Sequence, residues 1–263
     1  MASSLLRCRQ APCQFNVIVV FVNNIPSWDS GLEGDAHRRP YGEFRMPFDY
    51  SAPHLPTSLK ADRQGDVGIL WLAHDGKHDA VDEQTILGIE AYFSNLAHGI
   101  KAVVLANEAA HFSTGLDLNE LKGHGISDGI KHSRLWQRAF DSIQYGSVPV
   151  VAVLQGALVG AGLELAYAAH VRVAERSAVY ALPEEVLGFY FNGSTAVRLL
   201  RLIGVARVMD MMLTGRRYSA EEGQAIGLST YLVDNGKGFE KGVELAERIA
   251  NNANCSLFSS VRG

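Results

Sequence analysis

The stretch VPVVAVLQGALVGAGLELAYAA, Val148–Ala169, decides the fold because it joins a buried strand to a helix. Its first seven residues are apolar, which predicts a strand buried on both faces. Gly156, Gly160 and Gly162 follow, and the apolar run Gly162–His170 predicts a helix. N–H groups at such a helix start, together with the helix dipole, favour an anion or a developing oxyanion. The GxxxGxG spacing is neither a dinucleotide-binding fingerprint nor a phosphate-binding P-loop.

Glu164 lies in the first turn of this helix, within the otherwise apolar run GLELAYAA. A carboxylate in that setting is expected to face the core or a pocket, and the alternative is a glutamate favoured by the helix dipole. Glu184 and Glu185 follow a predicted strand, Val179–Leu182. The 20 residues from Glu164 to Glu184 allow a helix and a strand to return the second glutamate towards the first. Facing carboxylates supply one acid and one base, whereas adjacent surface glutamates are the alternative.

A second strand-to-loop junction occurs in AVVLANEAAHFSTGLDLNEL, Ala102–Leu121. Its strand leads into a loop with Gly115, and Asp117 stands near a predicted helix start. Main-chain N–H groups from two such loops form an oxyanion hole when they meet at one carbonyl oxygen. Whether these two loops meet depends on the tertiary structure.

Strands and helices alternate over residues 61–263, which predicts one α/β domain without a detectable internal sequence repeat. The predicted strands are Val67–Leu72, Ala102–Ala106, Val148–Leu154, Val171–Ala174 and Val179–Leu182, with an extended Leu228–Val233. The other predicted helices are Gln84–His98, Ile130–Ile143, Thr195–Leu202, Ala206–Thr214, Ala220–Gly227 and Gly242–Ala253.

Residues 1–60 hold six of the eight prolines and predict a poorly ordered extension, with a transit peptide as the alternative.

Composition narrows the classes of partner. Lys and Arg number 24 against 28 Asp and Glu, so the net charge of −4 argues against a nucleic-acid binder. The aliphatic runs Val17–Val22 and Val148–Leu154 are shorter than the roughly 20 residues of a membrane span, so no membrane partner is expected. The odd count of 3 cysteines fits a reducing compartment and offers no metal site. We expect a cytoplasmic location, with a mitochondrial one as the alternative.

Three segments resemble the crotonase (enoyl-CoA hydratase/isomerase) superfamily, and the resemblance runs from about residue 65 to residue 254. They are HFSTGLDL at His111–Leu118, VPVVAVLQGALVGAGLELAYAAHVRVAERSAVYALPE at Val148–Glu184, and MMLTGRRYSAEEGQAIGLSTYLV at Met211–Val233. The resemblance implies a spiral of ββα turns and assembly into homotrimers or hexamers. It also implies an acyl-CoA substrate whose enolate rests on two backbone N–H groups. Coenzyme A then enters as part of the substrate, and no cofactor or metal is implied.

The resemblance assigns roles to particular positions. The two oxyanion donors fall on Leu116 and Ala161, and the catalytic pair falls on Glu164 and Glu184. In hydration, Glu164 holds and deprotonates the water that attacks Cβ, and Glu184 gives a proton to Cα. The residues expected to contact the acyl-CoA are Leu116, Asp117, Leu118, Ala161 and Lys77.

The expected function is hydration of a 2-enoyl-CoA thioester to a 3-hydroxyacyl-CoA by a hydratase-like lyase. Two alternatives keep the CoA site: an enoyl-CoA isomerase and a hydroxycinnamoyl-CoA hydratase-lyase. A third is a non-catalytic CoA-binding or interaction protein, suggested by a C-terminal helical region that is shorter than in relatives and ends in NCSLFSSVRG. The segment AHDGKHDAV, Ala73–Val81, also departs from the family pattern.

Overall fold

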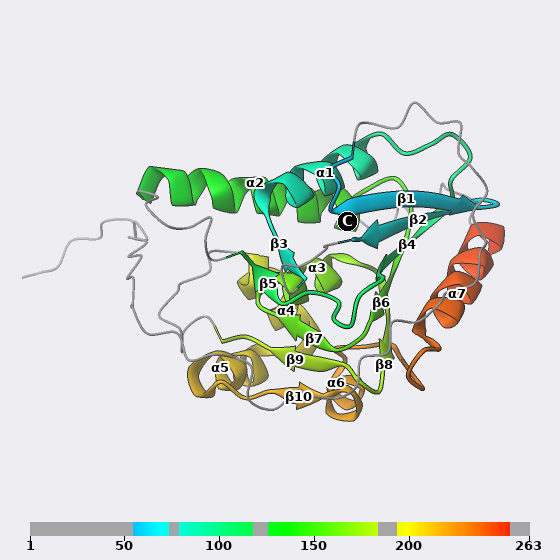
Figure 1. Ribbon diagram of the computed structural model, residues 1–263. Coiled ribbons are helices and arrows are strands. Elements are labelled where there is room, and N and C mark those ends of the chain that lie inside the picture. Colours follow the sequence, from blue (N-terminus) through cyan, green and yellow to red (C-terminus); the bar gives the residue numbers. More distant parts are fainter. Residues whose placement is uncertain (1–54, 74–78, 118–125, 184–193, 253–263) are drawn as a thin grey trace, which may run out of the picture.

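A parallel sheet forms the centre of the molecule. The computed structural model describes residues 55–73, 79–117, 126–183 and 194–252, and these form a six-stranded sheet in the order β1-β2-β4-β6-β8-β11 (Figure 1). Its strands are β1 Leu59–Gln64, β2 Val67–Leu72, β4 Ala102–Asn107, β6 Val150–Leu154, β8 Val171–Glu175 and β11 Tyr231–Val233. β1 is antiparallel to β2, and the other neighbouring pairs are parallel. The predicted α/β class is confirmed.

The chain path repeats a unit of long strand, short strand and helix: β2-β3-α1, β4-β5-α2, β6-β7-α3 and β8-β9-α4. The further elements of these units are β3 Ala80–Val81, α1 Glu83–Ser94, β5 Gly115–Leu116, α2 Ile126–Gln144, β7 Ala157–Val159, α3 Ala161–Ala168, β9 Val179–Ala181 and α4 Ser194–Ile203. The short strands pair with one another, β3 with β5 and β7 with β9. This is the ββα spiral that the resemblance implied. The repeat lies in the path of the chain, so a search for repeated residues does not detect it.

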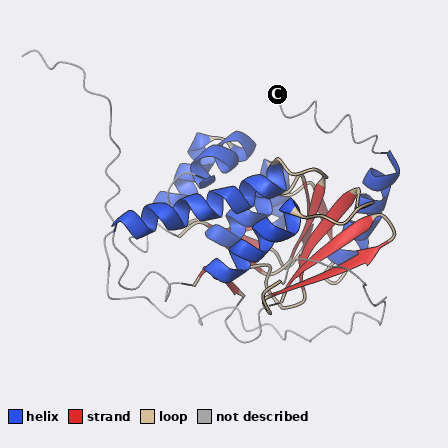
Figure 2. Cartoon of the chain, turned by 90° about the horizontal axis from the view of Figure 1, so that it is seen from above, coloured by secondary structure: helices blue, strands red, loops and turns tan. Residues whose placement is uncertain are grey.

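Helices cover both faces of the sheet, and the strand β4 shows how its residues divide between them. Val103 and Leu105 belong to the core on the side of α1, α2 and α3. A second core, on the side of helix α7, Gly238–Asn252, contains Ala102, Val104 and Ala106. Figure 2 shows the strands between these helices. Because alternate side chains point to opposite faces, a strand covered on both sides is apolar throughout, as AVVLA is.

The sequence predictions place the long helices and strands of the described residues correctly, with some helix ends displaced by four residues, and they miss short or polar strands. The helices α5 Val205–Thr214 and α6 Ala220–Ile226 agree with prediction to within a residue or two, whereas α7 begins four residues before the predicted Gly242. Strand β1 and the small strand β10 Tyr218–Ser219 were not predicted. Only the last part of the predicted extended run is a strand, β11. The predicted N-terminal extension covers residues 1–60, of which 1–54 lie outside the described residues, as do residues 253–263 at the C-terminal end. Strand β1 begins at Leu59, inside the predicted extension.

Two classes of feature are absent from the described part of the chain. None of its helices has the length and apolar character that crossing a membrane requires. No group of three or more His, Cys, Asp or Glu side chains within it is arranged to hold a metal ion.

Burial of a tyrosine predicts a loss of stability at high pH. Burial raises the pKa of Tyr180 from 10.0 to about 12. Because the pKa of Tyr180 is higher in the folded protein than in the unfolded chain, the contribution of this tyrosine to the free energy of unfolding is complete below pH 10. It is lost as the pH rises towards 12. Wild type should lose roughly 2 kcal/mol more unfolding free energy than Tyr180→Phe between pH 9 and 11.5, as measured by urea titration. Tyr145→Phe, at a tyrosine that is 47% exposed, should behave like wild type, and equal losses in all three proteins would contradict this prediction.

Candidate active site

Helix α3 begins at a sharp turn that the sequence marks with glycine. Gly160 has φ +50° and directs the chain from β7 into the helix. Its N–H donates to the carbonyl oxygen of Ala181 at 3.0 Å. Ala161 is the first helical residue, and an N–H at that position has no partner within the helix. The positive end of the helix dipole therefore coincides with backbone donors.

Glu164 is a buried acid in a helix that is otherwise apolar. All eight residues of α3 are buried, and Glu164 is 3% exposed. Side chains in a helix tilt towards its N-terminus, and residues three apart lie on one face. The carboxylate therefore leans towards the turn that holds Ala161. The prediction that this glutamate faces the core or a pocket is confirmed.

The second loop lies directly against the start of α3. The Ser113 N–H donates to Ala157 O at 3.2 Å, and the Val159 N–H donates to Ser113 O at 3.1 Å. Gly115 has φ +99°, and a Cβ placed there would lie 2.8 Å from Val159 O and 3.8 Å from Ala161 N. The two glycine-containing loops thus meet, which the sequence left open. Only glycine adopts this φ easily and permits so close an approach.

Leu116 turns its amide away from the neighbouring short strand. The N–H of the next residue, Asp117, donates to Val81 O at 3.2 Å. Successive amides of an extended strand point in opposite directions, so the Leu116 N–H points away from β3. Leu116 is 8% exposed and Ala161 is 2% exposed, so both amides lie in the interior. The arrangement offers two backbone donors from separate loops beside one buried carboxylate.

Ser113 positions this loop, a role that sequence reasoning missed. Its fully buried hydroxyl donates to Asp79 O at 3.0 Å and accepts from the Gly115 N–H at 3.1 Å. A Cβ on Gly162 would lie 2.5 Å from Ser113 Cβ, so the glycine lets α3 approach the loop. These contacts tie three segments together. The sequence signal was a small polar residue two positions before a glycine, too common to single out.

Hydrogen bonds on the far side of the loop hold its backbone in place. The Gln155 side chain donates to Asn107 O at 2.8 Å and to Ala109 O at 3.1 Å. The Asn107 side chain donates to Phe112 O at 3.0 Å. His111 Nδ1 accepts from the Ala157 N–H at 3.1 Å. The loop after β4 is therefore held along its length by β6 and β7.

Several predicted site residues cannot be compared with the structure. Glu184, Leu118 and Lys77 lie outside the described residues, as do Glu185 and most of the segment Ala73–Val81. Among the residues that are described, Leu116 lies in β5 beside the Gly115 loop, and Ala161 and Glu164 lie in the first turn of α3. Asp117 directly follows Leu116 and is partly exposed.

Comparison with known families gives a match over most of the chain. The family described as enoyl-CoA hydratase/isomerase matches residues 62–259, which include both loops and all of α3. The chain belongs to the enoyl-CoA hydratase/isomerase family. Family membership therefore accounts for the ββα spiral described above.

Relatives in this family include proteins of very different length. An enoyl-CoA hydratase of Thermus thermophilus, provisionally named as such, is 30% identical over 199 residues, which are 74% of this chain and 78% of that protein. The peroxisomal bifunctional enzyme of Pongo abelii is 36% identical over 155 residues, which are 59% of this chain. The match covers only 20% of that enzyme, so the chain spans about a fifth of its length.

A solved structure has the same fold at higher identity. A Rhodopseudomonas palustris CGA009 protein, provisionally named an enoyl-CoA hydratase, is 46% identical with a TM-score of 0.75. The superposition covers 78% of this chain and 80% of that one. The agreement extends over most of the described residues and supports the crotonase-like architecture.

Proposed function

We propose that this member of the enoyl-CoA hydratase/isomerase family adds water across the double bond of a 2-enoyl-CoA thioester. The product is a 3-hydroxyacyl-CoA, which makes the enzyme a lyase. The supporting observation is that two loops meet at the start of α3. A Cβ placed on Gly115 would lie 3.8 Å from Ala161 N. Backbone donors and a buried carboxylate then lie within about one helical turn of each other.

In this proposal the thioester oxygen accepts hydrogen bonds from the amides of Leu116 and Ala161. These donors stabilise the negative charge that develops on the oxygen as the enolate forms. Fixed backbone donors need no reorganisation during the reaction, and the dipole of α3 adds to their effect. Leu118 is proposed to contact the acyl-CoA with Asp117, by their place in the family pattern, and Lys77 is proposed to face the CoA phosphates. Coenzyme A is part of the substrate, and the proposal needs no separate cofactor.

The proton transfers are assigned to two glutamates. Glu164 takes a proton from water as the hydroxyl adds to Cβ, and Glu184 gives a proton to Cα. The hydroxyl group of water thereby adds to Cβ, a proton from Glu184 adds to Cα, and the Cα–Cβ double bond becomes a single bond. Proton exchange with solvent then returns Glu164 to its ionised form and Glu184 to its protonated form. The assignment of Glu184 rests on its place in the family pattern. A coupled pair of carboxylates shares its titration, so each role describes the main direction of transfer.

Absorbance and product analysis test this function. Purified protein is mixed with crotonyl-CoA and with a cinnamoyl-type CoA, and loss of the enoyl-thioester absorbance is followed. Hydration should yield a 3-hydroxyacyl-CoA. A product with a shifted double bond would replace the proposal by isomerisation, and a released aldehyde by hydratase-lyase chemistry. No turnover by the folded protein would favour the non-catalytic alternative.

We also propose that the protein assembles as a homotrimer or hexamer. Val205, Met209 and Leu213 are spaced four residues apart on α5 and are 62%, 43% and 62% exposed. Apolar residues at this spacing form one helix face, and such a face is typical of a subunit contact. Light scattering should give a mass three or six times 28.6 kDa. Leu213→Glu should lower that mass, while a wild-type mass of one subunit would contradict the proposal.

A further inference from the structure

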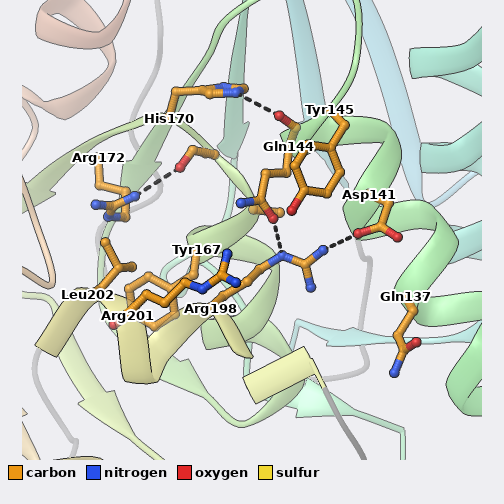
Figure 3. A pocket seen from close by; sticks show the side chains of 12 residues that line it. Gln137, Asp141, Gln144, Tyr145, Tyr167, His170, Arg172, Arg198, Arg201 and Leu202 are labelled. Carbon is orange, nitrogen blue, oxygen red and sulfur yellow. Dashed lines mark hydrogen bonds and ion pairs between the residues drawn. The ribbon is translucent and has the colours of Figure 1, made fainter. Parts of the chain in front are cut away.

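A cavity lies at the opposite end of α3 from Ala161. Its volume is about 430 Å³, and its walls come from the C-terminal turns of α2, the end of α3 and one face of α4 (Figure 3). The eight residues of α3 correspond to a length of about 12 Å, so the cavity is separate from the candidate active site. Its volume falls within the usual range of small-molecule pockets.

The side chains around this cavity are rich in positive charge. Arg172, Arg198 and Arg201 line it, whereas Asp141 is the one acidic residue among its described lining residues. Arg198 is paired with Asp141 and also donates to the Gln144 side chain. The lining of the cavity therefore holds three guanidinium groups and one carboxylate, which is paired with Arg198.

Arg172 is buried without a carboxylate partner among the lining residues. It is 7% exposed and donates to Leu228 O and Ala169 O, each at 2.9 Å. These acceptors are neutral carbonyl groups, so they satisfy hydrogen bonds without neutralising the charge. Burial lowers the pKa of Arg172, which reflects the cost of holding this charge away from water.

Nearby helix carbonyls are already satisfied by the fold. His170 Nε2 donates to Gln144 O at 3.0 Å, while its Nδ1 accepts from the Val150 N–H at 3.0 Å. Arg172 donates to Ala169 O just beyond the end of α3. The last carbonyl of α2 and the carbonyl just beyond α3 are thus each bound by one of these two side chains.

Arg201 is the exposed cation of the cavity. It makes no hydrogen bond or ion pair within the described part of the chain, and it lies one helical turn after Arg198. Figure 3 shows both side chains extending from α4 across the cavity towards α2. Like charges three residues apart on a helix repel each other, and a bound anion would relieve that repulsion. Guanidinium groups also match phosphate and carboxylate oxygens in a bidentate geometry.

We propose that this cavity binds a small organic anion through a phosphate or carboxylate group. Arg201 contacts the anionic group directly, and Arg172 and Arg198 contribute the surrounding positive potential. The cavity is larger than a single phosphate ion, so the ligand carries further atoms that lie against the polar and aromatic side chains of α2 and α3. This inference is independent of the proposed hydratase activity, because none of its residues belongs to the candidate active site.

Calorimetric titration of the full chain at constant ionic strength tests the proposal. The probes are inorganic phosphate, pyrophosphate and citrate, so the preferred probe distinguishes a phosphate from a carboxylate ligand. Arg201→Gln should weaken binding of the preferred probe about tenfold or more, because it removes hydrogen bonds from a charged donor. The melting temperature without ligand should not fall, since the side chain is exposed and unpaired in the described structure.

Arg248→Gln is the matched control. It removes the same charge from α7, where Arg248 is 67% exposed and lies 3.9 Å from Glu244. This variant should bind the preferred probe as tightly as wild type. Equal binding by Arg201→Gln and Arg248→Gln would overturn the proposal, and so would the absence of millimolar binding of all three probes to wild type.

Discussion

Glu164→Gln is expected to lower kcat for hydration of crotonyl-CoA by about 10²- to 10⁴-fold. Glutamine preserves the shape of the buried side chain but cannot accept the proton of the attacking water. Loss of a positioned general base has an effect of that size. KM should change less, because the substitution leaves in place the backbone amides of Leu116 and Ala161 that we propose to bind the thioester oxygen. The measurement is steady-state kinetics from the loss of enoyl-thioester absorbance.

Glu175→Gln is the control for this substitution. Glu175 is also buried, at 2% exposure, and its carboxylate accepts from the Gly238 N–H at 3.1 Å. It lies in β8 and contacts helix α7, so it belongs to the other side of the sheet. Its substitution should leave kcat close to wild type. Unchanged turnover in Glu164→Gln would disprove the role of Glu164 as the base, and Glu184→Gln then shows whether the other glutamate acts alone.

Gly115→Ala is expected to lower kcat by about 10²-fold. The alanine Cβ would lie 2.8 Å from the carbonyl oxygen of Val159, and the backbone φ of +99° is unfavourable for a residue with a side chain. The loop must therefore move, which separates the amide of Leu116 from that of Ala161. Loss of one oxyanion donor typically reduces kcat 10²- to 10³-fold. Kinetics with crotonyl-CoA and circular dichroism on the same preparation measure activity and folding together.

Gly65→Ala separates backbone strain from the effect on the site. Gly65 has φ +57° in the turn between β1 and β2, and its Cβ would have no neighbour within 4 Å. The variant should be slightly less stable than wild type, by about 1 kcal/mol, with unchanged kcat. If a folded Gly115→Ala protein matches Gly65→Ala in kcat, the amide of Leu116 does not stabilise the transition state.

The long apolar elements could be predicted because their burial is visible in their composition. The strand β4 is apolar except for its last residue, Asn107, and the helix α3 is apolar except for Glu164, which is conspicuous because it interrupts that pattern. By contrast, β1 has the sequence LKADRQ, with one fully buried residue. An edge strand of this kind takes its backbone hydrogen bonds from β2, so its own side chains carry little signal. Strands of two or three residues, such as β3 and β5, are too short for any periodicity.

The sequence by itself determined the α/β class, the strand-to-helix junctions and the buried position of Glu164, because local periodicity and isolated polar residues express these features. The tertiary structure alone decided that the Gly115 loop meets the start of α3 and that Ser113 ties the two together. It also decided that arginines from β8 and α4 share one cavity. These contacts join residues many positions apart, and pairing between strands and packing of helices set their distances. Residue patterns report which side chains are buried, whereas only the folded chain determines which buried groups are neighbours.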